Sequence, residues 1–329
     1  MNRILKKILI LLLVLCLLPC WAGADTVLYR ARITLACYVH TAKEDNSPTT
    51  EYLPLNSYVN ITGYDTEWLT VQVGGQKGYI RRNKIDRATP VDPVTTPPYG
   101  VEKSTYIATV AQTAPVLDLN GELLNTLGEG SRISILRLED GYAVVPYYRT
   151  FGYIDSRLLR DLIPVSVTDK PSNPRLPIAS FTTYFDYQTP TETNQNRVVN
   201  LIVSCVKLNN MVIPSGKTLD YNTEIGPFNS RQGYKIAPVF ADGTTKLGMG
   251  GGTCQVSSTV FNAILQLPGI DIIERRTHGR NGSVYLPIGM DSSVGTDTLN
   301  LIFKNNYDFD LRIEALAKDG ALFIAFYQN

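Results

Sequence analysis

Histidine is scarce in this chain of 329 residues, which has only His40 and His278, and no Cys-x-x-Cys pair is present. Protein metal sites are built largely from closely spaced His and Cys side chains, and the acidic residues here are scattered. The sequence therefore predicts no metal site. It also predicts no bound cofactor, because the glycine run at 250–252 lacks the lysine of a phosphate loop and no dinucleotide-binding fingerprint occurs.

An excess of charge of one sign is also absent. Lys and Arg number 31 against 30 Asp and Glu, for a net charge of +1. The first 24 residues contribute +3, so the remaining 305 carry −2. Because a nucleic-acid-binding surface needs a basic patch, we expect no nucleic-acid partner. The hydrophobic content of 44% fits globular structure, and the length allows two or three domains.

The one long hydrophobic run lies at the N-terminus. Arg3, Lys6 and Lys7 precede the apolar stretch 8–18, and Ala-Gly-Ala at 22–24 is a typical cleavage site. The run is shorter than the roughly 20 residues of a membrane span. We therefore expect a signal peptide at 1–24, no further integral membrane domain, and a secreted or envelope-associated location outside the cytoplasm. A retained anchor is the alternative, and lipidation at Cys20 is a variant that the preceding Leu-Pro disfavours.

Few cysteines remain after removal of a signal peptide. The mature chain keeps Cys37, Cys205 and Cys254, an odd number that leaves at least one thiol unpaired unless two chains pair through it. An exported chain of this size with so few cysteines is not a disulfide scaffold. Cys205 lies in a predicted helix at 196–210, where a buried, inert thiol is expected.

Two proline-rich stretches divide the mature chain and favour extended linkers. The predicted organisation is a signal peptide at 1–24, a β domain at 25–87, a linker at 88–103, a second β domain at 104–161, a linker at 162–178, and a C-terminal domain at 179–329.

The two β domains share a pattern. Trp68 begins a predicted strand ten residues before Gly78-Tyr-Ile, and Tyr142 stands ten residues before Gly152-Tyr-Ile. An offset of 74 residues indicates a domain duplication, and short alternating strands between turn residues indicate small barrels. The pattern resembles bacterial SH3-like domains, a resemblance that implies binding of cell-wall peptides or glycans.

The stretch 250–255, Gly-Gly-Gly-Thr-Cys-Gln, precedes an apolar pattern of helical spacing, with Val256, Val260 and Ile264 on one face. Cys254 would then lie at a helix N-terminus, where free N–H groups and the helix dipole favour a thiolate. Gly251, Gly252 and Gln255 could help to bind an oxyanion. The alternative is a small apolar residue at a tight turn.

His278 follows Cys254 by 24 residues, and Asp291 follows His278 by 13. This is an order that a cysteine nucleophile, its base and the orienting carboxylate could take. The alternative for His278 is a loop residue among Arg275, Arg276 and Arg280, whose charges would lower the histidine pKa or would hold a substrate carboxylate. Asp291 could equally be a turn residue.

Several stretches resemble the VanW family, which is named from an accessory gene of glycopeptide-resistance clusters. They are Ile-Gly-Pro-Phe at 225–228, Arg-Gln-Gly-Tyr-Lys-Ile-Ala-Pro-Val at 231–239, the glycine–cysteine stretch 250–259, Thr-His at 277–278 and Gly-Met-Asp at 289–291. The resemblance covers roughly residues 180–310. It implies an envelope location and a link to peptidoglycan, and it supplies no reaction. Arg231 and Tyr234 lie in it and could line the same site, although a turn around Gly233 is an equal alternative.

The C-terminal domain combines helices and strands. The predicted helix 196–210 carries Val199, Ile202, Val203 and Val206 along one face, and alternating strands are expected at 299–303, 311–315 and 322–326, with a hairpin at Asp-Gly 319–320. The predicted fold is therefore multidomain, with two small all-β SH3-like barrels followed by an α+β VanW-like domain with an antiparallel sheet. A helix bearing a cysteine beside such a sheet is also the layout of papain-like and transglutaminase-like enzymes.

Two functions follow as hypotheses. The first is an exported enzyme that acts on peptidoglycan peptides, with Cys254, His278 and Asp291 in acyl transfer or amide hydrolysis. The second is a non-catalytic accessory protein, related to VanW of vancomycin resistance, that binds the cell wall or a glycopeptide and in which Cys254 is structural. Support of the assembly of other envelope proteins is a third role that the sequence neither favours nor excludes.

Overall fold

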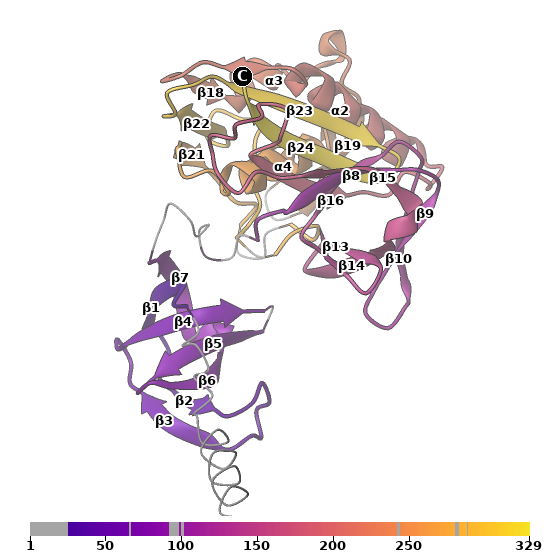
Figure 1. Ribbon diagram of the computed structural model, residues 1–329. Coiled ribbons are helices and arrows are strands. Elements are labelled where there is room, and N and C mark those ends of the chain that lie inside the picture. The colour runs from indigo at the N-terminus through magenta and orange to yellow at the C-terminus, as the bar shows by residue number, and fades with distance from the viewer. Residues whose placement is uncertain are drawn as a thin grey trace, which may run out of the picture. The chain divides into compact units, whose positions relative to one another are not determined.

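The computed structural model describes residues 26–65, 67–91, 99, 102–241, 244–279, 283–287 and 289–329. The predicted signal peptide and much of the first predicted linker lie outside these residues. The chain falls into two compact units, Met1–Val91 and Asp92–Asn329 (Figure 1). Each unit is described by itself below.

The first unit is an all-β module with one antiparallel sheet in the order β3-β2-β6-β5-β4-β1-β7. Alternation along β1 buries Tyr29, Ala31 and Ile33 and exposes Arg30 and Arg32. Among the described residues the pairing order is open, so a closed SH3-like barrel stays a prediction. The strands are β1 (Tyr29–Ile33), β2 (Cys37–His40), β3 (Thr49–Leu53), β4 (Tyr58–Tyr64), β5 (Trp68–Val73), β6 (Gln76–Arg81) and β7 (Ile85–Pro90), with the 3-10 turn η1 (Arg82–Lys84) before the last.

The second unit begins with another all-β module. It has one antiparallel sheet in the order β10-β9-β14-β13-β12 and one in the order β11-β8-β15. Its elements are β8 (Tyr106–Val110), β9 (Ala114–Leu117), β10 (Leu123–Leu127), β11 (Arg132–Ile135), β12 (Arg137–Glu139), β13 (Tyr142–Tyr147), β14 (Thr150–Asp155), η2 (Ser156–Leu158) and β15 (Leu159–Pro164).

The repeat seen in the sequence extends to the register of the two hairpins. Trp68 pairs with Arg81 in β5–β6, and Tyr142 pairs with Asp155 in β13–β14, at the same offset of 74 residues. The repeated glycine has one physical reason in both modules. A Cβ at Gly78 would lie 2.2 Å from a methyl group of a valine on β2, and a Cβ at Gly152 would lie 2.5 Å from one on β9. A neighbouring strand fills the space that a larger residue would need.

The C-terminal part has a central antiparallel sheet in the order β16-β24-β23-β17, with smaller sheets β18-β22-β21 and β19-β20. It is α+β, as expected, and the hairpin at Asp319-Gly320 is confirmed, because both residues have positive φ. Its elements are β16 (Ala179–Tyr184), α2 (Glu192–Leu208), β17 (Val212–Ile213), β18 (Thr218–Asp220), α3 (Tyr221–Ile225), η3 (Ser230–Gln232), β19 (Ile236–Ala241), β20 (Thr244–Met249), α4 (Thr253–Ile264), β21 (Ile270–Arg275), β22 (Leu301–Asn305), β23 (Leu311–Lys318) and β24 (Ala321–Gln328).

Strand β24 is buried on both of its faces. Leu322, Ile324 and Phe326 point into the core that contains α2 and α4. The alternate residues, among them Phe323, pack with Ile107 of the second β module. Figure 1 accordingly shows β8 and β15 beside β16 and the yellow strand β24. The stretch 162–178, predicted as a linker, therefore joins the second β module to the C-terminal part, and these two parts share a core. The domain boundary itself stays a prediction.

Helix α2 exists as predicted but buries a different face. Its side-chain cap is Thr191, and its buried residues are Asn200, Leu201, Ser204, Cys205 and Leu208. The expected apolar face is wrong, because Val206 is 69% exposed. Hydrophobicity was misleading since Asn200 and Ser204 are polar, yet they are buried with hydrogen-bond partners on neighbouring segments. Cys205 is buried as predicted.

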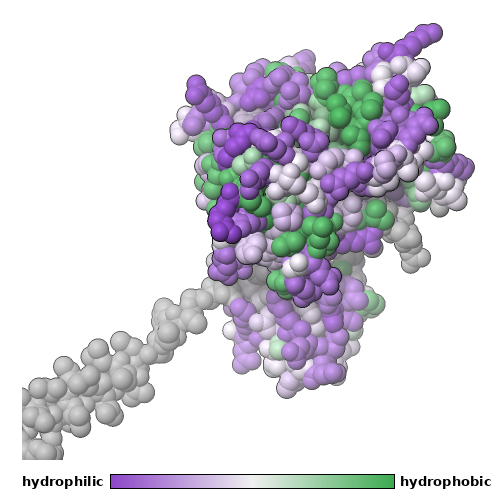
Figure 2. All heavy atoms as spheres, turned by 90° about the vertical axis from the view of Figure 1, so that its right-hand side faces the viewer, coloured by the Kyte–Doolittle hydropathy of each residue, from purple (hydrophilic) through white to green (hydrophobic). Residues whose placement is uncertain are grey.

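Hydrophobic residues reach the surface in separate patches, which hydrophilic residues interrupt (Figure 2). Within the described part of the chain, no helix has both the length and the apolar content of a membrane span. In the same residues, no group of three or more His, Cys, Asp or Glu side chains is arranged to hold a metal ion.

Phe323→Ala should destabilise the second unit by about 3–5 kcal/mol, because it empties space between β24 and the second β module. Urea unfolding of the full chain, followed by far-UV circular dichroism, measures this. Trp68 is the only tryptophan among the described residues and lies in the first unit, so its fluorescence transition should not move. Phe240→Ala is the matched control, because Phe240 is half exposed. Equal effects of the two substitutions would contradict the shared core.

Candidate active site

The glycine run before α4 is required by packing within the chain itself. A Cβ at Gly251 would lie 2.4 Å from the carbonyl oxygen of Pro238 on β19. Gly250 and Gly252 have φ values of 78° and 111°, which residues with a Cβ rarely adopt. The freedom of these residues therefore serves the turn into α4 and its contact with β19.

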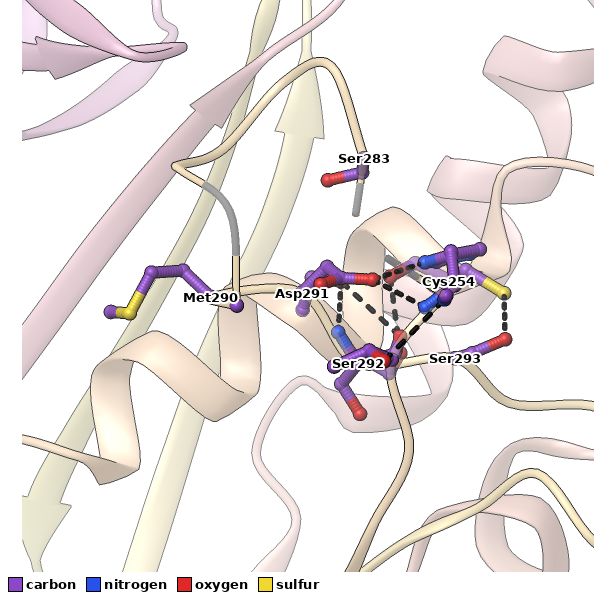
Figure 3. A network of polar contacts seen from close by, with 12 residues as sticks. Cys254, Ser283, Met290, Asp291, Ser292 and Ser293 are labelled. Atoms are coloured by element: carbon purple, nitrogen blue, oxygen red, sulfur yellow. Dashed lines mark hydrogen bonds and ion pairs between the residues drawn. The ribbon is translucent and has the colours of Figure 1, made fainter. Parts of the chain in front are cut away.

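Cys254 is the second residue of α4 and is half-buried. Its Sγ accepts a hydrogen bond from the backbone N–H of Val294 at 3.4 Å and lies 3.9 Å from the hydroxyl oxygen of Ser293. Figure 3 shows Asp291, Ser292 and Ser293 gathered beside this end of the helix. The thiol thus faces donors from loop 290–294 as well as the positive end of the helix dipole.

His278 and Asp291 form a tight pair. One carboxylate oxygen of Asp291, Oδ2, accepts from the backbone N–H of His278 at 2.7 Å and lies 2.6 Å from Nδ1 of the same histidine. Asp291 is 0% exposed. Since Nδ1 is engaged by the carboxylate, Nε2 is the ring nitrogen left to face Cys254, which is close enough to raise the pKa of His278. The structure therefore brings the three predicted residues together in the predicted order.

The protonation states follow from this contact. Burial raises the pKa of the Cys254 thiol, but the hydrogen bond and charge of His278 outweigh it, and the pKa lies below its ordinary value. Burial lowers the pKa of His278, but hydrogen bonds to Asp291 and Cys254 outweigh it and raise the pKa to about 9. The expected lowering by neighbouring arginines is therefore wrong, because the partners of His278 are anions. Both shifts favour the thiolate–imidazolium form of the pair.

Helix α4 holds the loop of Asp291 through a row of polar side chains. Ser257 and Ser258 donate to the carbonyl oxygen of Ser292 at 2.7 and 3.2 Å, and the backbone N–H of Ser292 donates back to Ser258 at 2.8 Å. Asn262 donates to the carbonyl oxygen of Met290 at 2.7 Å. The side chain of Met290 points away from this cluster in Figure 3. The distance between the Asp291 loop and Cys254 is thus set by residues of the same helix.

Arg275 fastens the other side of the loop. Its Nε donates to the carbonyl oxygen of Asp291 at 2.8 Å, and Nη2 donates to the carbonyl oxygen of Gly289. The guanidinium lies over the ring of Phe261 on α4, 4.5 Å from the centroid. These contacts occupy Arg275 within the fold, so it does not have the substrate-carboxylate role considered for the arginine cluster. Arg280 lies outside the described residues.

The residues predicted to bind substrate lie in different surroundings. Tyr234 is 1% exposed and donates its hydroxyl to the carbonyl oxygen of Ile225 at 2.9 Å, so it is a core residue and not a binding residue. Gln255 donates both amide hydrogens internally, to the hydroxyl of Thr183 and the carbonyl oxygen of Tyr184. Its side chain therefore has no free donor for an oxyanion. Arg231 is exposed on η3.

Sequence reasoning missed three groups at the site. They are the backbone N–H of Val294, the hydroxyl of Ser293, and Arg197 of α2, which donates to Gln255. A backbone donor leaves no trace in composition. Arg197 looks like an ordinary surface cation on an amphipathic helix, and its position over the start of α4 depends on tertiary packing.

Comparison with known proteins supports the C-terminal resemblance. Residues 196–327 match the family described as VanW like protein, so this region contains a VanW-like domain. The chain is 31% identical over 185 residues to "Uncharacterized protein YoaR" of Bacillus subtilis (strain 168). This match covers 56% of the chain and 55% of that protein, about half the length of the relative.

Two solved structures, NlpC1 and NlpC2 from Trichomonas vaginalis, align at 15% and 14% identity, each with a TM-score of 0.18. The alignments cover 87% and 92% of this chain, and 91% and 98% of the two solved chains. At that TM-score they add nothing to the assignment.

The rate of alkylation of Cys254 by iodoacetamide should rise with pH at a midpoint below the pKa of roughly 8.5 of a free thiol. The reason is that thiolate forms as the pH rises through the lowered pKa of Cys254. Mass spectrometry of the digested protein gives the rate at each pH. In His278→Ala the imidazolium is gone and burial is unopposed, so the midpoint should move upward. Cys205 is the internal control, because burial raises the pKa of its thiol and it should stay unlabelled. A wild-type midpoint at or above the free-thiol value would contradict the ion pair.

Proposed function

We propose that this protein is an exported cell-envelope enzyme that uses Cys254 as nucleophile in acyl transfer or amide hydrolysis on peptidoglycan peptides. His278 acts as acid and base, and Asp291 orients it. The observation that carries the proposal is the contact of a lowered-pKa thiol with a histidine whose Nδ1 is held by a buried carboxylate. Cysteine nucleophiles are activated by an adjacent base in this way.

The reaction begins with attack of the thiolate on the substrate carbonyl. The first N–H groups of a helix have no partner within it, and the N–H of Cys254 at the start of α4 is the donor that we assign to the developing oxyanion. The imidazolium of His278 gives its Nε2 proton to the leaving amine as the C–N bond breaks, which leaves a thioester. Water or an acceptor amine then loses a proton to His278 and attacks, and the C–S bond breaks.

The substrate class and location rest on different support. The VanW-like domain carries a family resemblance to proteins of glycopeptide-resistance clusters, and the predicted signal peptide directs export. We also propose that the two β modules are SH3-like and bind wall peptides or glycans. Two weak modules in one chain raise the local concentration of substrate without additional contacts.

A second function is favoured by two features of the packing around Cys254. The glycine run packs against the chain itself, and Cys254 is half-buried against Val294. Both features are expected of a non-catalytic accessory protein that binds the wall or a glycopeptide. In such a protein Cys254 would be a structural residue and would carry out no reaction.

Substitution of Cys254 separates the two functions. With soluble peptidoglycan fragments as substrate and mass spectrometry as readout, Cys254→Ser should reduce turnover by at least about two orders of magnitude, because a serine hydroxyl is not ionised beside this histidine. Thermal unfolding should change little. Cys205→Ala is the matched control, since loss of this fully buried thiol should lower stability and leave turnover per folded molecule intact. A loss of stability in Cys254→Ser with unchanged binding would support the accessory protein.

The pH dependence of turnover should be bell-shaped. Activity rises as thiolate forms and falls as the pH passes about 9, where His278 loses the proton that the leaving group needs. Asp291→Asn should move the falling limb to lower pH, because the hydrogen bond to the carboxylate raises the pKa of His278. A falling limb that stays in place in this variant would assign the descent to another group.

A further inference from the structure

We propose that Arg197 binds a carboxylate of the substrate, so that the site takes acyl substrates with a free carboxylate close to the carbonyl that Cys254 attacks. The inference rests on the proposed nucleophilic role of Cys254. It deepens that role by naming an anionic class of substrate, recognised by a residue outside the glycine–cysteine stretch 250–259.

The stem of Arg197 lies against the turn that precedes the thiol. A Cβ at Gly252 would lie 3.1 Å from Cγ of Arg197 and 3.3 Å from a methyl group of Leu201. A larger residue would press on both side chains, and the φ of 111° at this position also favours glycine. The arginine therefore passes over a residue that is two positions before Cys254.

Gln255 holds the guanidinium in place. Its Oε1 accepts from Nη2 of Arg197, and its own amide is fixed by donation to Thr183 at 3.0 Å and to the carbonyl oxygen of Tyr184 at 2.9 Å. A guanidinium held by a fixed amide loses little conformational freedom when it binds a planar anion. Gln255, considered above as an oxyanion donor, instead positions Arg197.

The charge of Arg197 has no close carboxylate among the described residues. Its one hydrogen bond there goes to the neutral amide of Gln255. The carboxylate that acts on its charge is that of Asp186, which is itself hydrogen-bonded to Thr189 and to the backbone of Gln188. A partly buried cation without a carboxylate hydrogen-bonded to it is costly. A substrate carboxylate would offset that cost through the remaining N–H groups of the guanidinium.

The surroundings of Arg197 fit an anionic ligand. Arg197 is close enough to Cys254, Tyr148 and Tyr285 for mutual electrostatic effects. Tyr148 belongs to the turn between β13 and β14, and the next residue, Arg149, donates to the carbonyl oxygens of Ser283 and Leu286 at 3.1 and 3.2 Å. These bonds fix the turn of the second β module on the segment 283–287, and both tyrosines lie near the same guanidinium.

Two alkylating reagents of nearly equal size test the assignment. Iodoacetate carries a carboxylate, and iodoacetamide replaces it by a neutral amide. With both reagents in the full-length protein, wild-type Cys254 should show a higher ratio of iodoacetate rate to iodoacetamide rate than Arg197→Gln, by about tenfold, the effect of one charge-assisted hydrogen bond. The iodoacetamide rate should stay within about twofold, because the neutral reagent reports only the thiolate and the intact site.

Two further variants serve as controls. Arg157→Gln removes the same charge from a side chain that is 86% exposed, and it should leave the ratio unchanged. Arg197→Lys keeps the charge without the planar fork, and the ratio should fall between those of wild type and Arg197→Gln.

The outcomes separate this inference from the proposed function. An equal loss with both reagents in Arg197→Gln would make Arg197 a stabiliser of the thiolate and overturn the carboxylate assignment. An unchanged ratio would overturn it as well. A wild-type thiol that reacts with iodoacetamide like a free cysteine would instead overturn the nucleophile on which the inference rests.

Discussion

The hydrogen bonds between α4 and loop 290–294 are the constraint on which the candidate site depends. Apart from Cys254, every residue of α4 is buried, and the helix nevertheless carries Ser257, Ser258 and Asn262. Buried hydroxyl and amide groups without partners would cost about 1–3 kcal/mol each. Each donates to a carbonyl oxygen of the helix and also to a backbone carbonyl of the loop, so departure of the loop would leave the loop carbonyls of Met290 and Ser292 without these donors. The carboxylate of Asp291 and the thiol of Cys254 therefore take their separation from one rigid element.

The sheet behind α4 imposes a second constraint. Because β24 is buried on both faces, the sheet that supports the helix is completed by the second β module. That module also places Arg149 on the carbonyl groups of segment 283–287. Part of its surface thus packs against the C-terminal domain. Binding to the cell wall alone would therefore account for only part of its structure. A domain duplication can diverge in this way, with one copy recruited into the core of its neighbour.

The parts of the fold that depend on local pattern could be predicted from the sequence. Helix α4, the Asp319-Gly320 hairpin and the repeated Trp68 and Tyr142 hairpins follow from periodicity and turn residues. The convergence of Cys254, His278 and Asp291 was suggested by order alone. The buried face of α2 was not predictable from hydrophobicity, because Asn200 and Ser204 are buried through specific long-range partners. The burial of Tyr234, in the polar stretch that resembles the VanW family, is a further tertiary effect.

The arginines illustrate why the remaining part of the site could not be predicted. Arg275 stands three residues before His278 and looked like an anion-binding residue, yet backbone carbonyl groups and the ring of Phe261 occupy it. Arg197 stands 57 residues before Cys254 and carried no signal, yet it crosses Gly252 and retains N–H groups without a protein acceptor among the described residues. What distinguishes the two is the number of internal acceptors that each guanidinium meets. The number of internal acceptors depends on how the chain packs and cannot be read from the sequence. It leaves Arg197, the arginine farther from Cys254 in sequence, with N–H groups for a ligand.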